Sequence, residues 1–286
     1  MIVCVASGKG GTGKTTVATN LAAASDEPVY FLDCDVEEPN AHLFLRPEIT
    51  ATLDFALEVP EIDRDKCTFC GKCQEICQFN ALAILPETVL TFPELCHSCG
   101  GCFLVCPENA VLSGRRVVGQ VEIGHRGKIA FAHGRLRVGE ALAPPLIRRV
   151  KQEAAGHRDL TIIDAPPGAS CPVVNALWGA DFALLVTEPT PFGLNDLELA
   201  VGAVRELNIP CGLVINRADL GDRKVLDYAT RESLPVFLEI PFDREAATAY
   251  AQGQLLVDAL PRWRQWMLTL RDRLQEALQR ERARRR

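Results

Sequence analysis

The chain of 286 residues lacks features that mark several classes of protein. Its apolar residues never form a run of the roughly 18 to 20 that a membrane-spanning helix needs. Its formal net charge is only −6, so we expect no broad basic surface and no nucleic acid partner. Aromatic residues are scarce at 6%, yet 48% of residues are apolar and 24% are charged. These proportions are typical of a globular protein.

We also expect no secretory leader, because a β-branched apolar stretch begins at Ile2 and a glycine-rich loop follows it directly. Cysteine, by contrast, is abundant, with 12 residues. In a chain without a leader, so many cysteines indicate metal ligation in a reducing compartment rather than disulfide bonds. We therefore expect a cytoplasmic protein.

The first motif is the glycine-rich loop, which lies between a predicted strand at 2–6 and a predicted helix at 14–24. Its glycines let backbone amides turn toward a phosphate, and the helix N-terminus adds positive charge. Lys14 is predicted to reach the β- and γ-phosphates of ATP, and Thr15 to hold Mg²⁺. The predicted nucleotide-binding residues of this loop are Gly8, Gly10, Gly11, Thr12, Gly13, Lys14, Thr15 and Thr16.

Short apolar runs then alternate with helical patterns. Strands are predicted at 29–32, 160–163, 183–187, 212–215 and 236–240, and helices at 194–207, 222–232 and 243–252. This alternation predicts an α/β fold, a mostly parallel doubly wound sheet of the P-loop NTPase kind. We also expect a short helical stretch that runs to about residue 57, before Pro60 interrupts the pattern. Over residues 115–139 we expect a β-meander with glycine turns.

Eight cysteines form two copies of the spacing C-x2-C-x2-C-x3-C, about 29 residues apart. They are Cys67, Cys70, Cys73 and Cys77, followed by Cys96, Cys99, Cys102 and Cys106. This spacing is typical of ligands to [4Fe–4S] clusters. Zinc is the alternative, but a zinc site in C-x2-C pairs leaves the third and fourth cysteines of each copy unused. The sequence therefore predicts two [4Fe–4S] clusters.

These patterns divide the chain into four segments. Residues 1–59 and 143–286 are predicted to form the two parts of a P-loop ATPase domain that ends in a C-terminal helix. Residues 60–114 are predicted to form an inserted ferredoxin-like α+β domain, and 115–142 a basic β-hairpin or meander. The prediction is thus an ATPase domain that is interrupted by a cluster-binding insert.

Lys9 makes the loop K-G-G-x-G-K-T, which resembles the deviant phosphate loop of the MinD/ParA/Mrp ATPases, a group that includes the nitrogenase iron protein. The resemblance covers roughly residues 1–57 and 143–260. It implies an ATP-dependent homodimer in which Lys9 reaches the nucleotide of the facing subunit. Asn40 lies where the group often has an asparagine at the dimer face.

The same resemblance implies roles for residues that follow predicted strands. Asp35 matches the switch I aspartate that orients the attacking water, and Asp164 the switch II aspartate on the Mg²⁺ side. The Gly168 amide is implied to contact the γ-phosphate, and Asn216 to read adenine. The predicted catalytic residues are Lys9, Lys14, Asp35 and Asp164, and the predicted Mg²⁺ site consists of Thr15, Asp35 and Asp164. For Asp33, a functional role and a solvated strand-end carboxylate stay equally open.

The cysteine segment resembles a bacterial two-cluster ferredoxin, in which the fourth cysteine of each motif ligates the other cluster. The resemblance implies one cluster on Cys67, Cys70, Cys73 and Cys106, and another on Cys96, Cys99, Cys102 and Cys77. Gln78 departs from the family's usual proline after the fourth cysteine, which removes no ligand. An ATPase with an inserted ferredoxin resembles a branch of MinD-like ATPases, which implies no particular substrate.

Four cysteines lie outside the two motifs. Cys4, Cys34 and Cys211 are interpreted as small buried residues. Cys171, seven residues after Asp164, has two interpretations. It is either a further buried thiol, which we favour, or a redox or cluster-transfer thiol.

Two charged segments also have two interpretations each. Residues 115–151 contain nine Lys or Arg against two acidic residues. They either pack beside the acidic insert or dock an acidic redox partner. The apolar stripe from Trp263 to Leu278, which precedes arginines at 282 and 284–286, either packs on the sheet or contacts a membrane. We expect packing, and no membrane contact.

Together these motifs predict an ATP-binding, ATP-hydrolysing iron–sulfur protein. The first interpretation is a nucleotide-switched homodimer that couples Mg-ATP hydrolysis to electron transfer through the two clusters. The second is an assembly or carrier ATPase for iron–sulfur or metal cofactors, although the C-x-x-C pair of Mrp-like carriers is not seen outside the ferredoxin motifs. The third is a MinD/ParA-like positioning switch with redox-sensing clusters.

Overall fold

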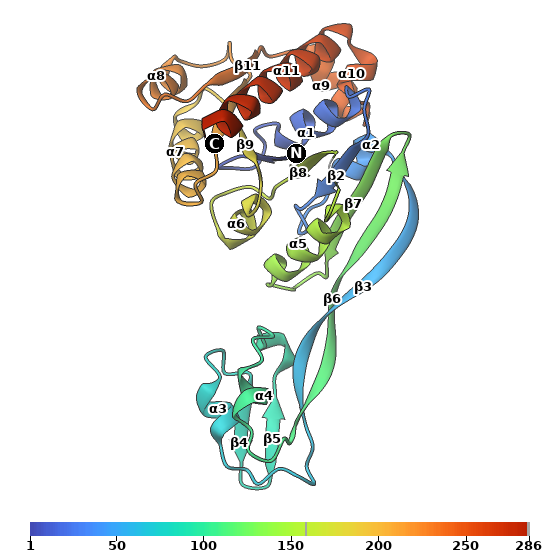
Figure 1. Cartoon of the computed structure of the whole chain (residues 1–286), viewed down its shortest axis with the longest axis vertical. Helices are drawn as coiled ribbons and strands as arrows, with labels where there is room; N and C mark the ends of the chain where they lie inside the picture. The colour runs from blue at the N-terminus through green and yellow to red at the C-terminus, as the bar shows by residue number, and fades with distance from the viewer. Residues whose placement is uncertain (158, 285–286) are drawn as a thin grey trace. The chain divides into compact units, whose positions relative to one another are not determined.

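The computed structural model describes residues 1–157 and 159–284. Arg285 and Arg286, which belong to the predicted basic end, lie outside the described residues. The chain forms two compact units (Figure 1). The first consists of Met1–Thr52, Val121–Arg135 and Ala143–Arg286, and the second of Leu53–Gln120 and Leu136–Leu142. The glycine-rich loop thus belongs to the first unit, and all eight motif cysteines to the second.

The described chain contains a nine-stranded sheet with the order β11-β10-β9-β1-β8-β2-β7-β6-β3. The strands are β1 (Ile2–Ala6), β2 (Val29–Asp33), β3 (Glu48–Ile62), β6 (Val111–Arg126), β7 (Ile129–Leu136), β8 (Leu160–Asp164), β9 (Phe182–Thr187), β10 (Cys211–Asn216) and β11 (Val236–Ile240). From β11 to β7 every neighbouring pair is parallel. A two-residue turn at Gly127-Lys128 joins β6 to β7, so this pair is antiparallel. The predicted α/β fold with a mostly parallel sheet is confirmed.

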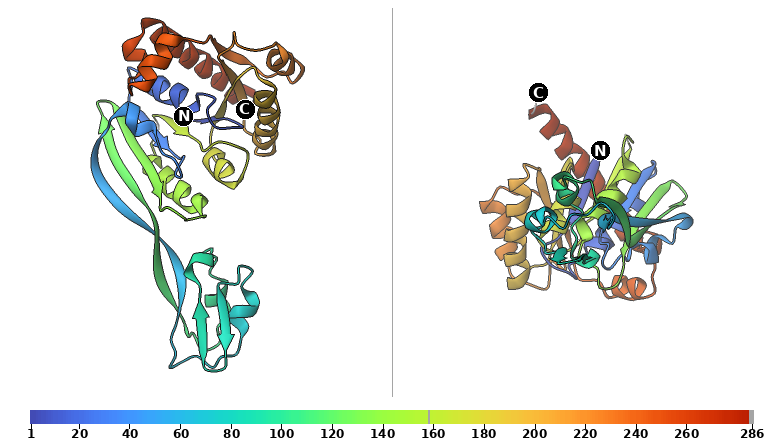
Figure 2. Two further views of the ribbon diagram at one scale, coloured as in Figure 1. Left: turned by 180° about the vertical axis from the view of Figure 1, so that it is seen from behind. Right: turned by 90° about the horizontal axis from the view of Figure 1, so that it is seen from below.

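Helices cover both faces of this sheet in the first unit (Figure 2). They are α1 (Lys14–Ala23), α2 (Ala41–Leu45), α5 (Ala143–Lys151), α6 (Cys171–Leu177), α7 (Pro191–Glu206), α8 (Lys224–Arg231), α9 (Arg244–Ala251), α10 (Leu256–Ala259) and α11 (Pro261–Arg284), with a 3₁₀ turn η2 (Gln152–Ala154) after α5. Helices α1 and α11 pack together on one face, and α5 and α6 on the other.

The apolar stripe of α11 is buried. Trp263, Met267, Leu270, Leu274 and Leu278 join the main hydrophobic core, which also contains apolar residues of α1. The stripe therefore packs inside the first unit, as expected. Among the described residues, no helix combines the length and apolar character that crossing a membrane requires.

The second unit is small and contains short elements besides its parts of β3 and β6. An antiparallel hairpin is formed by β4 (Leu82–Leu85) and β5 (Thr88–Thr91), and two short helices, α3 (Lys72–Ile76) and α4 (Gly101–Val105), pack together. A 3₁₀ turn, η1 (Pro93–Leu95), precedes the second cysteine motif. The second unit has two small apolar clusters, of which one contains Cys96 and the other contains Cys102. These cysteines therefore belong to the small hydrophobic core of the second unit.

The backbone of the second unit repeats itself. Left-handed residues recur 29 positions apart, as Phe69 and Ser98, Gly71 and Gly100, and Asn80 and Asn109. In both copies the fourth cysteine accepts an amide hydrogen from the residue four positions later. The distances are 3.3 Å from Ala81 N to Cys77 Sγ and 3.2 Å from Ala110 N to Cys106 Sγ. The duplication seen in the sequence is therefore also a duplication of conformation.

Residues 48–62 correct one prediction. They form strand β3, whereas the expected helical stretch to about residue 57 is limited to α2, which ends at Leu45. Leu53, Phe55 and Leu57 recur with the period of two that is typical of a strand. Pro60 does not break β3, because β3 is the last strand in the sheet order and an edge strand tolerates a missing N–H.

Of the hairpin and the meander predicted for residues 115–142, the structure has the hairpin, because β6 and β7 are long strands joined by one turn. Gly124 and Gly134 lie inside these strands rather than at turns. A Cβ on Gly124 would lie 2.3 Å from the Glu48 carbonyl oxygen, and one on Gly134 would lie 2.7 Å from Val36 Cγ1. Both glycines therefore serve close packing. The two compact units share residues 115–142 between them.

Candidate functional site

The glycine-rich loop joins the end of β1 to the start of α1. Gly11 and Gly13 have φ angles of 79° and 93°, a left-handed conformation that glycine adopts without a steric penalty. The cavity beside the loop is lined by Ser7, Gly10, Gly11, Gly13, Lys14, Thr15 and Thr16. The loop thus presents the first turn of α1, with its unpaired N–H groups, to the cavity.

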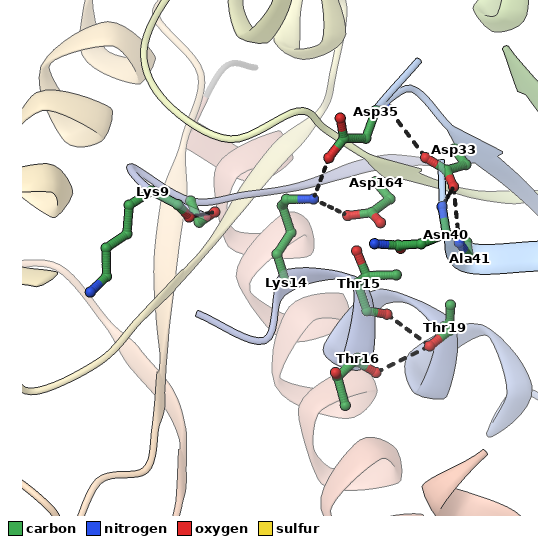
Figure 3. Close-up of polar contacts among 11 residues, drawn as sticks. Lys9, Lys14, Thr15, Thr16, Thr19, Asp33, Asp35, Asn40, Ala41 and Asp164 are labelled. Carbon is green, nitrogen blue, oxygen red and sulfur yellow. Dashed lines mark hydrogen bonds and ion pairs between the residues drawn. The ribbon is translucent and has the colours of Figure 1, made fainter. Parts of the chain in front are cut away.

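Lys14 lies at the centre of a buried charge cluster (Figure 3). Its Nζ donates a hydrogen bond to Asp164 Oδ1 at 2.9 Å and lies 3.8 Å from Asp35 Oδ2. Burial opposes the charge on Lys14, but the two carboxylates outweigh it and raise the pKa of the ammonium group. Burial also raises the pKa of Asp35 to about 6, although Lys14 acts against this shift. The structure therefore brings Lys14, Asp35 and Asp164 together.

Two buried side-chain oxygens, Asp164 Oδ2 and Thr12 Oγ1, have no hydrogen-bond partner among the described residues. Asp164 is fully buried, so its free oxygen has no access to bulk water. Thr15, on the first turn of α1, lines the cavity next to Lys14 in the chain (Figure 3). Carboxylate and hydroxyl oxygens suit Mg²⁺, which is usually held by one or two carboxylates together with a phosphate. The donor set fits such an ion.

Asp33 is not the solvated strand-end carboxylate that was one of its two interpretations, because its side chain is enclosed in the protein. It is fully buried, and its carboxylate accepts hydrogen bonds from the backbone N–H groups of Asp35, Asn40 and Ala41 at 3.0 to 3.1 Å. Burial, reinforced by the charge of Asp164, raises the pKa of Asp33. These bonds hold the turn after β2, and so they position Asp35 and Asn40, which line the cavity.

Lys9 points away from Lys14 and the aspartates (Figure 3). Its Nζ lies 3.7 Å from Glu188 Oε2, and Glu188 Oε1 accepts a hydrogen bond from Arg217 Nη1 at 2.7 Å. Glu188 and Arg217 are not among the residues predicted from the sequence. A signal was present, because Glu188 directly follows β9 and the carboxyl ends of parallel strands meet at the ligand-binding edge of the sheet.

Two residues predicted to contact the nucleotide are bonded to the loop region instead. The Gly168 amide donates to the Ser7 carbonyl, and Asn216 Nδ2 donates to the Thr12 carbonyl, both at 2.9 Å. Asn216 nevertheless lines the cavity. A contact between the Gly168 amide and a γ-phosphate requires this amide to leave Ser7.

The eight motif cysteines of the second unit line two separate cavities. One is lined by Cys67, Cys70 and Cys73 of the first motif and by Cys106 of the second. The other is lined by Cys96, Cys99 and Cys102 of the second motif and by Cys77 of the first. Each cavity therefore combines three cysteines of one motif with the fourth cysteine of the other.

The sulfur atoms of these cavities differ in exposure. Cys70 and Cys99 are exposed, whereas Cys96 and Cys102 are buried. Burial raises the pKa of the Cys73, Cys96 and Cys102 thiols, to about 11 for Cys102. Within the described residues, no three His, Cys, Asp or Glu side chains come close enough to hold a single metal ion. The cysteines thus surround two cavities rather than converge on single-ion sites.

Comparison with known proteins places the chain in a family. Residues 3–257 match the family model described as the CobQ/CobB/MinD/ParA nucleotide binding domain. The chain belongs to this family. An uncharacterised protein from Methanocaldococcus jannaschii is 31% identical over 280 residues, which are 96% of this chain and 97% of that protein. A solved structure, the septum site-determining protein MinD complexed with Mg-ADP from Pyrococcus horikoshii, superposes with a TM-score of 0.61 at 19% identity and covers 96% of this chain and 95% of MinD. At this identity the likeness concerns the fold alone.

Two further relatives carry names that concern iron and sulfur. An iron–sulfur cluster carrier protein from Aquifex aeolicus is 26% identical over 278 residues, which are 91% of this chain and 62% of the carrier. An uncharacterised ferredoxin from Methanocaldococcus jannaschii is 34% identical over 55 residues, which are 18% of this chain and 71% of the ferredoxin.

The four cysteines outside the two motifs of this MinD/ParA-family chain differ in burial. Cys4 and Cys34 are fully buried, and burial raises the pKa of Cys4 to about 12. Cys211 is half-buried. Cys171 is exposed as the first residue of α6, so the buried-thiol interpretation of this residue is wrong.

Four arginines of residues 115–151 form ion pairs within their own compact unit. Arg116 pairs with Glu140, Arg126 with Asp258, Arg135 with Glu122 and Arg149 with Glu153. These ion pairs do not test whether the segment packs beside the acidic insert, and that interpretation stays a prediction.

Proposed function

We propose that the chain is an ATPase that binds two [4Fe–4S] clusters and couples Mg-ATP hydrolysis to electron transfer through them. The observation that supports the clusters best is the crossed arrangement of the cysteines, three from one motif and one from the other around each cavity. This arrangement is the one that two-cluster ferredoxins use, and a zinc site has no need of it.

In the nucleotide site, Lys14 is the residue whose partners change on binding. In the described structure its charge is neutralised by Asp164 and Asp35. When Mg-ATP binds, the phosphates can take the Lys14 ammonium group, and Asp164, Asp35 and Thr15 can turn to Mg²⁺. Asp35 is then placed to orient the water that attacks the γ-phosphate. We assign Lys14, Asp35 and Asp164 to hydrolysis on this basis.

We further propose that two chains associate when ATP is bound, with Lys9 reaching the nucleotide of the facing subunit. The support is that the Lys9 side chain points away from the site of its own chain (Figure 3). The resemblance to the MinD/ParA/Mrp loop implies the same arrangement. Asn40, beside the cavity, would lie at the shared face.

In the second unit, Cys67, Cys70, Cys73 and Cys106 would hold one cluster, and Cys96, Cys99, Cys102 and Cys77 the other. Each bound cluster supplies a site that gains or loses one electron. The exposed Cys70 and Cys99 give each cavity a ligand at the surface. There, one electron can arrive from a one-electron donor protein or leave to a one-electron acceptor.

Coupling is tested by redox titration with EPR detection under anaerobic conditions, in the absence of nucleotide, with MgADP, and with a non-hydrolysable ATP analogue. We expect the ATP analogue, and not MgADP, to shift the potential or the line shape of at least one cluster. Clusters whose signals ignore all three conditions would contradict the coupling, although not the presence of the clusters.

Ligand crossing is tested separately, by comparing serine variants. Cys106→Ser should alter the same EPR signal as Cys73→Ser, and Cys77→Ser should alter the other. Cys211→Ser, outside both motifs, is the matched control and should retain the full iron content. A pattern in which Cys106→Ser and Cys102→Ser alter the same signal would contradict the crossed assignment, and purified protein with zinc in place of iron would contradict the clusters.

A second candidate is cluster delivery, favoured by the similarity to an iron–sulfur cluster carrier protein over most of this chain. In that case the clusters leave the protein with their iron and sulfide, and ATP controls their release. Incubation of the ⁵⁷Fe-loaded chain with an apo-ferredoxin and ATP distinguishes the two functions. Transfer of ⁵⁷Fe supports delivery, whereas retention of all iron during repeated reduction and oxidation supports electron transfer.

A further inference from the structure

Lys9 forms an ion pair with the carboxylate of Glu188 in its own chain. The sequence of the glycine-rich loop does not predict this partner. Lys9 Nζ lies 3.7 Å from Glu188 Oε2, and the Lys9 side chain is 31% exposed while that of Glu188 is 9% exposed. At this distance the contact is an ion pair without a hydrogen bond. Such a pair is weak enough to open and close readily.

The backbone on both sides of this pair is closely packed. The Glu188 carbonyl accepts a hydrogen bond from Thr190 N at 2.8 Å, and a Cβ on Gly193 would lie 2.3 Å from the same carbonyl oxygen. On the other side, a Cβ on Gly8 would lie 2.0 Å from the Asp196 carbonyl oxygen. The loop before Lys9 is thus pressed against α7, and the two charges face each other from fixed backbones.

Arg217 lowers the free energy that is needed to separate Lys9 from Glu188. Its Nη1 donates to Glu188 Oε1 at 2.7 Å, so Glu188 keeps one close cation when Lys9 departs. A buried carboxylate that loses its only partner is strongly unfavourable, but a carboxylate shared by two cations is not left unpaired. Arg217 also lines the nucleotide cavity and has a φ of 53°. Glu188 therefore connects Lys9 to the wall of that cavity.

The surroundings of the pair are apolar and exposed. Phe192, in the first turn of α7, is 79% exposed, and Leu220, in the loop after β10, is 60% exposed. The segment with Leu220 reaches the neighbourhood of Glu188, because a Cβ on Gly221 would lie 1.7 Å from the Pro189 carbonyl oxygen. Exposed apolar side chains thus lie on both chain segments that adjoin Glu188.

We propose that Glu188 is a positioning residue that retains Lys9 on its own subunit and releases it when a second, ATP-bound copy approaches, with Arg217 then neutralising Glu188 alone. This inference rests on the proposed ATP-dependent homodimer. It adds that Glu188 opposes formation of the homodimer. Glu188 competes with the facing nucleotide for one ammonium group, and so it sets the protein concentration at which two copies associate.

The test is sedimentation velocity of the cluster-loaded protein over a range of concentrations, with a saturating non-hydrolysable ATP analogue and Mg²⁺. Glu188→Gln removes the charge with little change of shape, and we expect it to strengthen self-association about two- to fivefold, the range for one partly exposed ion pair. Glu232→Gln is the matched control, because Glu232 also pairs with an arginine, Arg205, at 2.7 Å. It should associate like the unmodified chain.

Lys9→Ala separates this role from a structural one. In a Lys9→Ala background, Glu188→Gln should have no further effect on association, because the residue that it releases is gone. Glu188→Asp should restore the association constant of the unmodified chain at least in part. Thermal unfolding with bound nucleotide is compared for all variants, so that a folding defect is recognised.

Each other outcome decides against the proposal in a recognisable way. If the unmodified chain associates with the ATP analogue but Glu188→Gln associates equally or more weakly, Glu188 does not restrain Lys9. The same holds if Glu188→Gln strengthens association in the Lys9→Ala background. If the unmodified chain stays monomeric at every concentration with the analogue, the proposed homodimer fails, and the role of Glu188 fails with it.

Discussion

At the scale of single residues, Lys14 and Asp164 depend on each other. The Asp164 carboxylate is fully buried, and Lys14 is the cation that donates to it. Removing one partner from a buried pair leaves an uncompensated charge, whereas an exposed pair contributes little. The nucleotide site is therefore also a point of stability when no nucleotide is bound.

We predict that Lys14→Ala lowers the free energy of unfolding by about 3 to 5 kcal/mol in Mg²⁺-free buffer, because Asp164 and Asp35 then lack their cation. Saturating Mg²⁺ should recover part of this loss. Urea unfolding with and without Mg²⁺ provides the measurement. Lys224→Ala, which breaks the exposed pair with Asp222, should cost less than about 1 kcal/mol. Equal losses for both variants would show that burial of the Lys14 pair is not what matters.

His133 gives the first unit a dependence on pH. The ring is almost fully buried on β7, and its Nε2 lies 2.5 Å from Glu122 Oε2, with His42 packed against it and Arg135 nearby. Its Nδ1 has no partner among the described residues. Burial lowers the pKa of His133, and the contact with Glu122 only partly opposes this shift. A neutral ring with its proton on Nε2 satisfies the geometry, because a proton on Nδ1 would be buried without an acceptor.

The sign of the pH effect follows. The unfolded chain takes up a proton on this histidine as the pH falls through about 6.5, while the folded chain resists it, so acid favours unfolding. The stability linked to His133 is complete above this pH and declines below it. We predict that His133→Gln, which can still donate to Glu122, loses less stability between pH 7 and pH 5.5 than the unmodified chain. Urea unfolding at both pH values checks this, and exposed His125→Gln should retain the original difference.

At the scale of elements, the parallel strands explain why distant residues form one site. The ends of β2, β8, β9 and β10 carry Asp33, Asp164, Glu188 and Asn216. In a parallel sheet these ends lie at the same edge. The glycine-rich loop follows β1, which lies between β8 and β9, and so it contacts Asp164, Glu188 and Asn216.

Strand β6 provides a test of close packing between elements. At Gly124 a Cβ would lie 2.3 Å from a backbone oxygen of Glu48, which cannot rotate away as a side chain can. We predict that Gly124→Ala destabilises the chain by about 1 to 3 kcal/mol, because the strands must separate. Gly202→Ala in α7, with nothing within 4 Å, should be neutral or stabilising by up to about 1 kcal/mol. Chemical unfolding of both variants decides, and a neutral Gly124→Ala would contradict the packing role.

At the scale of the whole molecule, the two units differ in what stabilises them. The first has a large apolar core under α1 and α11. The second has two small apolar clusters, and both include motif cysteines. A unit with so small a core usually needs metal or other cross-links to stay folded.

We predict that removing iron unfolds the second unit and spares the first. Hydrogen exchange of the cluster-free chain should lose protection over residues 53–120, while the core strands β1, β8 and β9 keep theirs and the chain still binds nucleotide. The reconstituted, cluster-loaded chain is the control and should recover protection in both units. Full protection of 53–120 without iron would show that this unit folds on apolar contacts alone, contrary to the prediction.

The sequence by itself determined the features that depend on local pattern. The apolar runs located the strands of the parallel sheet to within about one residue at most ends, as for Ile2–Ala6 and Val236–Ile240. The α/β fold followed from their alternation with helices. The family resemblance rested on one short loop, and the proposed cluster ligands on spacing alone. The strands, the fold and the family were predicted correctly because periodicity and spacing are properties of neighbouring residues, whereas the cluster ligands stay a prediction.

The tertiary structure decided which distant residues meet. Glu188 and Lys9 are far apart in the chain, and no local pattern pairs them. Asp33 proved buried, with the N–H groups of the following turn folded back onto it. Cys171 proved exposed, and β3 is a strand because a neighbour supplies its ladder of hydrogen bonds. Burial and contacts between distant residues are set by the packing of whole elements. For that reason, local sequence patterns do not predict them.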